Sequence, residues 1–134
     1  MWNDVSRPPS AEEYQLIQWL LTRSGPQAKA YFPQLEEVQV CGVCTCGCPT
    51  IHLTVPEHIP AVASGVRLLG DCVGEVNGVD VGVLLFQANG RLSMLEIYAF
   101  GENPSPFPLP EASRLVAWEN LSQRRPDGLK TTAK

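Results

Sequence analysis

The sequence lacks the features that would insert it into a membrane or export it. Its uninterrupted apolar runs are short, as in Val83–Phe86, whereas a membrane-spanning helix needs about 20 apolar residues. The first residues, Met1–Asp4, have neither the basic start nor the apolar stretch of a secretory signal. We therefore expect a cytoplasmic protein that makes no use of a membrane.

Residue types and motifs that carry catalysis are also scarce. The chain has only two histidines, no serine in a Gly-x-Ser-x-Gly turn and no glycine-rich phosphate loop. The carboxylates of the second half need not form an acid/base pair: Asp71 and Glu75 are better explained as strand residues that face solvent, and Glu96 as an edge residue beside surface aromatics. These absences weaken the case for an enzyme and favour a non-catalytic binding or interaction domain.

The composition is that of one globular domain. Of 134 residues, 44% are hydrophobic and 18% are charged, which excludes disorder as the default state. Residues 124–134 hold four cations and one anion, whereas the rest of the chain is acidic. We expect a domain over residues 1–123 and a basic tail over 124–134. Because an acidic body repels phosphate, it should not bind nucleic acid.

Local signals predict an N-terminal helix over residues 11–24. Ser10–Glu13 is a capping box, and Gly25-Pro26 is a stop signal. Between them, apolar side chains recur on one stripe at helical spacing, at Tyr14, Leu16, Ile17, Leu20 and Leu21. Residues 1–9, polar and containing two prolines, predict an irregular lead-in, and residues 26–31 predict a second short helix.

Alternating apolar residues then predict strands. One pair, near Val38–Cys41 and Ile51–Val55, should form a hairpin with a cysteine-rich tip. Three longer runs cover Val66–Val76, Val79–Gln87 and Arg91–Phe100. Asn-Gly pairs separate them, which is typical of tight hairpin turns and predicts a three-strand antiparallel meander.

The expected fold class is therefore α+β, with the amphipathic helix packed on a mostly antiparallel sheet of about five strands. Val79–Phe86 is apolar on both faces, so this strand should be central and covered on both sides, which favours a protein partner or a homodimer. After it, the proline-rich residues 101–110 should run extended over the surface, and Glu111–Leu121 should form a last short helix.

Four of the five cysteines crowd into one short segment, at Cys41, Cys44, Cys46 and Cys48. Clustered thiols without a secretory signal indicate metal or redox chemistry rather than a disulfide scaffold. Structural zinc takes four tetrahedral ligands, so these cysteines are the expected ligand set, with His52 as the alternative ligand for a missing corner. In an extended chain Cys44, Cys46 and Cys48 would project to one side and gather three thiols without a zinc knuckle. The spacings match no common iron–sulfur pattern.

Two other interpretations of the cluster stay open. A redox protein would use Cys41 and Cys44 as a dithiol, but the chain has no lysine or arginine between Lys29 and Arg67 to stabilise a thiolate. In the other interpretation, the cysteines only pack a tight buried loop. Cys72, which stands alone among apolar residues, is expected in the core.

Short motifs also carry a resemblance. Cys44–Pro49, together with Leu95–Tyr98 and Pro106–Pro110, resembles small bacterial proteins that carry domains of unknown function. That resemblance implies a single cytosolic domain and transfers no activity. The small acidic α+β chain is also similar in general character to bacterial toxin-immunity proteins, which implies an acidic inhibitor that binds a basic toxin.

Overall fold

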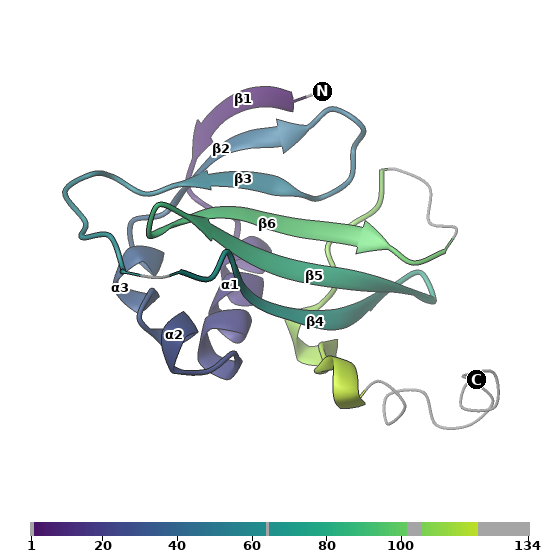
Figure 1. The fold of residues 1–134 in the computed structure, drawn as a ribbon. Helices are drawn as coiled ribbons and strands as arrows, with labels where there is room; N and C mark the ends of the chain where they lie inside the picture. Colours follow the sequence, from purple (N-terminus) through teal and green to yellow (C-terminus); the bar gives the residue numbers. More distant parts are fainter. Residues whose placement is uncertain (1, 64, 102–105, 121–134) are drawn as a thin grey trace.

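The structure, a computed structural model, describes residues 2–63, 65–101 and 106–120. They form an α+β fold in which one six-stranded sheet carries its helices on one side (Figure 1). The helices are α1 (Ala11–Arg23), α2 (Pro26–Lys29) and α3 (Phe32–Leu35), followed late in the chain by the 3-10 turns η1 (Ala112–Arg114) and η2 (Trp118–Asn120). The strands are β1 (Trp2–Arg7), β2 (Gln39–Cys44), β3 (Ile51–Thr54), β4 (Leu68–Val76), β5 (Val79–Ala88) and β6 (Arg91–Ala99).

The strands lie in the order β1-β2-β3-β6-β5-β4, and every neighbouring pair is antiparallel. The predicted meander of β4, β5 and β6 is confirmed, as is the hairpin of β2 and β3. Both Asn-Gly turns have positive φ throughout, at 54° and 79° for Asn77-Gly78 and 55° and 79° for Asn89-Gly90. This backbone matches the right-handed twist of the strands it joins.

The expected number of strands was wrong, because the residues assigned to an irregular lead-in form β1. Trp2–Arg7 pairs with β2 at the edge of the sheet and stays largely exposed. An edge strand receives backbone hydrogen bonds from one neighbour only and buries little side-chain area, so it needs no apolar alternation. Pro8-Pro9 then ends the strand, since proline cannot donate to a ladder.

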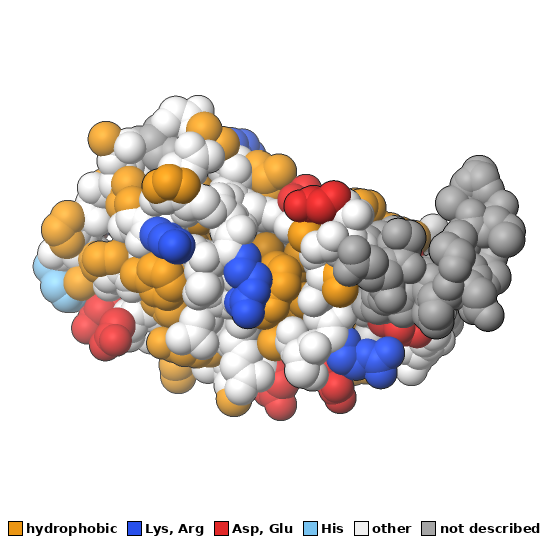
Figure 2. Space-filling view, turned by 90° about the horizontal axis from the view of Figure 1, so that it is seen from below, with side chains coloured by type: hydrophobic (Ala, Val, Ile, Leu, Met, Phe, Trp, Pro, Cys, Tyr) orange, Lys and Arg blue, Asp and Glu red, His pale blue; other side chains and the backbone are white. Residues whose placement is uncertain are grey.

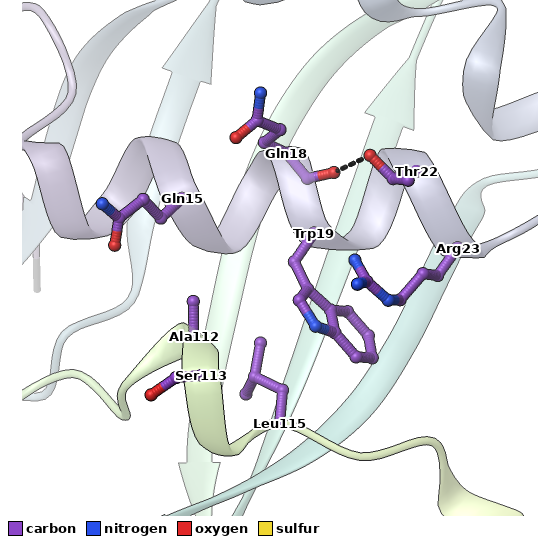
Figure 3. A pocket seen from close by; sticks show the side chains of 8 residues that line it. All are labelled: Gln15, Gln18, Trp19, Thr22, Arg23, Ala112, Ser113 and Leu115. Carbon is purple, nitrogen blue, oxygen red and sulfur yellow. Dashed lines mark hydrogen bonds between the residues drawn. The ribbon is translucent and has the colours of Figure 1, made fainter.

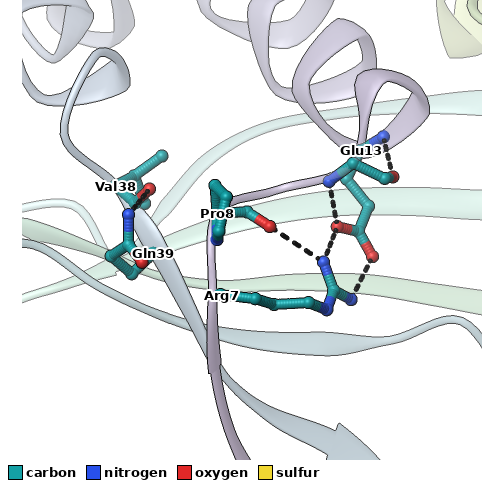
Figure 4. A network of polar contacts seen from close by, with 6 residues as sticks. Arg7, Pro8, Glu13, Val38 and Gln39 are labelled. Carbon is teal, nitrogen blue, oxygen red and sulfur yellow. Dashed lines mark hydrogen bonds and ion pairs between the residues drawn. The ribbon is translucent and has the colours of Figure 1, made fainter.

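The capping box at the start of α1 is confirmed, and it also holds β1. The Glu13 N–H donates to Ser10 Oγ (3.1 Å), and the Ser10 N–H donates to Glu13 Oε1 (2.8 Å). The Arg7 guanidinium donates two hydrogen bonds to the same carboxylate, at 2.8 and 3.0 Å (Figure 4). Burial raises the pKa of Glu13, but the bonds from Arg7 and Ser10 outweigh burial and leave that pKa below its usual value.

The final helix predicted for Glu111–Leu121 is wrong over its described residues, which form only the short turns η1 and η2. Between the turns Val116 pairs with Val73 of the edge strand β4, through two backbone hydrogen bonds of 2.9 Å. These two hydrogen bonds satisfy backbone groups on the edge of β4, which a continuous helix could not do because its own backbone groups are bonded within the helix. The basic tail predicted over 124–134 lies outside the described residues.

The core fills the space between the helices and one face of the sheet. Its fully buried members include residues of α1 (Leu16, Ile17, Leu20, Leu21) and of the central strands (Val81, Val83, Leu85, Leu95). Cys72 lies among them as expected, and burial raises its pKa to about 12. β5 is central, as predicted, because β6 and β4 flank it.

The opposite, outer face of the sheet carries a second group of apolar side chains. Tyr98 lies directly over Gly82, where an added Cβ would be only 2.6 Å from the tyrosine ring. Its ring contacts Phe100, which stacks on Trp118, both at 5.3 Å between centroids. These three rings stay about 40% exposed, at 40%, 42% and 38%. The same face continues toward β1 through Met94 and His52, which are paired across β6 and β3.

Candidate metal centre

The predicted cysteine-rich tip joins β2 to β3, and its backbone is held at both ends. Cys44 is the last residue of β2, and the Gly47 N–H donates to its carbonyl (3.3 Å) to close a tight turn. Gly47 has a φ of 93°, a conformation that side chains rarely adopt. At the far end the buried Thr50 hydroxyl donates to the Ile97 carbonyl (3.1 Å) and accepts from the Ile97 N–H (2.9 Å), which fastens the tip to β6.

This turn brings three thiols together. The sulfur atoms of Cys44, Cys46 and Cys48 all lie within 4.8 Å of one another. The Cys44 and Cys46 sulfurs share a hydrogen bond at 3.0 Å, and the Cys48 N–H donates to Cys46 Sγ at 3.3 Å. Ligands at the usual zinc–sulfur distance of about 2.3 Å stand about 3.8 Å apart around a tetrahedral ion. The group could therefore hold a metal ion after small side-chain adjustments.

One side of the cluster is anchored and the other is open. Cys48 is half-buried and packs against the core, whereas Cys46 is exposed. The turn also lies against the proline-rich segment, since a Cβ added at Gly47 would be 2.9 Å from Pro106 Cβ. The neighbouring Phe107 is buried in the core. An ion bound here would thus be held by a fixed loop and would still face solvent.

The hydrogen bond with the Cys46 side chain raises the pKa of the Cys44 thiol. The free cysteines form no disulfide in this structure. Metal ions bind thiolates rather than thiols, so an incoming ion must displace protons from this group.

The other residues predicted as ligands, Cys41 and His52, do not belong to the group of three thiols. Cys41 sits where the register of β2 against β3 shifts, between Val40 and Gly42, and is not a member of the group. His52 lies opposite Gly42, and its ring stacks on the Trp2 indole with centroids 3.8 Å apart. Its role as an alternative ligand stays a prediction.

Trp2 is the neighbour of the site that sequence analysis missed. It pairs with Cys44 across β1 and β2, so the indole lies on the same side of the sheet as that thiol. No sequence pattern indicated this contact, because β1 carries no apolar alternation and was not expected to be a strand.

The grooves in the described part of the chain are weaker candidates for a functional site than the cysteine-rich tip. The groove between α1 and η1 measures about 520 Å³, and its walls carry amides, hydroxyls and the Trp19 indole with Arg23 stacked on it at 4.7 Å (Figure 3). On the face seen in Figure 2, acidic, basic and apolar side chains are interspersed, so charge of one sign does not gather there.

Glu96 is half-buried opposite Leu84 on the central strand β6, not on an edge strand as expected.

In comparisons with known proteins, no family model, curated protein or solved structure matches the chain. Among the described helices, none is long and apolar enough to cross a membrane. The fold and site together define an α+β domain with a three-cysteine group that could hold a metal ion.

Proposed function

We propose that this chain is a small, non-catalytic metal-binding domain in which the thiolates of Cys44, Cys46 and Cys48 hold a zinc ion. The observation that carries the proposal is the gathering of three sulfur atoms within 4.8 Å at a hairpin tip. Thiolate ligands favour zinc and other thiophilic ions over hard cations such as magnesium or calcium. The ion would cross-link the turn between β2 and β3 and stabilise it, as structural zinc does in small domains.

Three cysteines leave one corner of a tetrahedral ion for water or for a donor from a binding partner. The exposed side of the cluster is consistent with such an open corner. A binding role is further supported by the exposed rings on the outer face, including Trp2 beside Cys44 and the Tyr98–Phe100–Trp118 group. Contiguous exposed apolar side chains of this kind mark interaction surfaces or ligand-binding grooves.

The test is the metal content of the protein, purified anaerobically without added metal and measured by elemental mass spectrometry. We expect about one zinc per chain, the loading that a single site requires. Cys44→Ser, Cys46→Ser and Cys48→Ser should each lose most of it. Cys41→Ser is the matched control, because it removes a thiol from the same hairpin but outside the group. Cobalt substitution then reports the coordination geometry, since tetrahedral thiolate sites give intense visible absorption.

The proposal would be refuted if the purified wild-type protein contained no zinc and also failed to take up zinc or cobalt added in solution. Loss of metal in Cys41→Ser equal to that in Cys46→Ser would refute the three-cysteine set. A melting temperature that rises with zinc in the wild type but not in Cys46→Ser would show that the ion stabilises the folded chain.

A further inference from the structure

Two of the three clustered sulfurs are poised for a covalent bond. Cys44 Sγ and Cys46 Sγ are 3.0 Å apart, so they need to approach by only about 1 Å to reach the disulfide bond length of about 2.05 Å. The turn closed by the Gly47 N–H and the Cys44 carbonyl keeps the two backbones together while they do so.

Exposure also decides which thiol an oxidant reaches first. Cys46 is exposed, Cys44 is half-buried, and Cys72 is buried in the core. The susceptibility of a cysteine to oxidation follows its thiolate character and its exposure, and a sulfenic acid formed beside a second thiol condenses with it to a disulfide. Cys46 therefore fits the role of the attacking residue and Cys44 that of the resolving residue.

We propose that Cys44 and Cys46 form a reversible disulfide in response to hydrogen peroxide, and that this disulfide releases the bound metal ion. The Cys46 sulfur attacks one peroxide oxygen, the O–O bond breaks, and the second oxygen leaves as hydroxide that takes up a proton to become water. The Cys44 sulfur then attacks the Cys46 sulfenic acid, which forms the S–S bond and expels the second water. Two thiols are oxidised by two electrons, and one peroxide is reduced to two waters.

The release of the ion rests on the proposed function, whereas the disulfide does not. A disulfide sulfur is no longer a thiolate, so the reaction removes two of the three ligands and leaves Cys48 alone. A single thiolate cannot retain zinc against water and cellular chelators. Reduction of the disulfide by a small thiol regenerates the two ligands through thiol–disulfide exchange. The hairpin tip would thus couple metal occupancy to peroxide.

The experiment treats zinc-loaded protein with hydrogen peroxide and follows three quantities in the same sample. A chromogenic chelator reports free zinc, a thiol reagent counts the remaining thiols under denaturing conditions, and mass spectrometry gives the intact mass. We expect zinc release to track the loss of two thiols and of the mass of two hydrogen atoms. Dithiothreitol should reverse the mass change and, with zinc present, restore binding.

Variants locate the bond, because all four clustered cysteines fall in one tryptic peptide. Metal-free Cys48→Ser should still lose two hydrogens, whereas Cys46→Ser and Cys44→Ser should not. Cys41→Ser should behave like the wild type. Oxidation that adds oxygen atoms without a disulfide, or a disulfide abolished by Cys41→Ser, would overturn the inference.

Failure of the inference is distinguishable from failure of the proposed function. A chain that binds zinc but forms no disulfide overturns the inference alone. A chain that never binds zinc but forms the disulfide overturns the proposed function together with the metal-release step, and confirms the redox pair.

Discussion

Gln34 is a buried amide that ties three backbone segments together, and its removal should be costly. The side chain is 1% exposed, and its Nε2 donates to the carbonyls of Gly90 (2.8 Å) and Pro60 (3.3 Å). Its Oε1 accepts from the Leu92 N–H (3.0 Å). One amide thus fastens α3 to the β5–β6 turn and to the loop that precedes β4.

Gln34→Met keeps the length of the side chain and deletes all three bonds. The Gly90 carbonyl retains the Val62 N–H as a donor at 2.9 Å, and Pro60 is exposed enough for water to replace the lost partner. The Leu92 N–H is left buried without a partner, at a cost of about 1–3 kcal/mol. Adding about 1 kcal/mol for the lost net contribution of the other bonds, we expect unfolding free energy to fall by about 2–4 kcal/mol.

Urea denaturation at 25 °C, followed by circular dichroism, measures that difference. The matched control is Gln39→Met, because Gln39 is half-buried and its amide only reaches the adjacent Val38 carbonyl at 3.4 Å (Figure 4). That variant should change the free energy by less than about 0.5 kcal/mol. Equal midpoints for Gln34→Met and Gln39→Met would refute the assignment of a clamping role to Gln34.

Three other residues give predictions with separate readouts. The pKa of Glu13 is lowered in the folded chain. The ionised Glu13 side chain therefore stabilises the fold above its unfolded pKa of about 4.3, and this stabilisation is lost as pH falls through the folded pKa. In acid titrations, Glu13→Gln should flatten the loss of folding stability below about pH 5. Gly74→Ala places a Cβ 2.7 Å from Pro110 Cβ and should destabilise by about 1–3 kcal/mol in thermal melts, whereas Gly65→Ala, with nothing within 4 Å, should not. Thr50→Val leaves the Ile97 N–H without its acceptor, so it should cost about 1–3 kcal/mol and weaken zinc binding in a chelator competition.

Each of these has an outcome that contradicts it. An unchanged acid titration in Glu13→Gln would mean that the ion pair with Arg7 contributes nothing to folding. Equal melting temperatures for Gly74→Ala and Gly65→Ala would show that the segment around Pro110 can move away from β4 without a loss of stability. A Thr50→Val protein that is destabilised but binds zinc normally would separate the anchoring of the tip from the metal affinity.

Short-range chemistry made much of the fold predictable. The capping box at Ser10–Glu13 and the two Asn-Gly turns act over a few residues, so they specify the start of α1 and the meander whatever the rest of the chain does. The projection of Cys44, Cys46 and Cys48 to one side is equally local. It anticipated the three sulfurs that the structure brings together, although a turn rather than a strand does so.

Register was not predictable from alternation alone. Leu92 and Met94 have the same parity, which suggests a shared face, yet Leu92 is buried in the core and Met94 lies on the outer face. The ladder of β5 and β6 shifts between Phe86 and Gln87, where two residues of one strand oppose one of the other. Such a bulge reverses the parity beyond it, and no single side chain encodes it.

The sequence by itself determined the elements whose signals are local: the amphipathic helix, the tight turns and the crowding of thiols at one tip. Only the tertiary structure decided that polar Trp2–Arg7 becomes an edge strand, that Trp2 pairs with Cys44, and that the group of thiols within 4.8 Å does not include Cys41. These outcomes depend on pairing between residues far apart in the chain. Pairing of that kind is selected by the burial and hydrogen bonding of the whole sheet, to which each residue contributes only a small part.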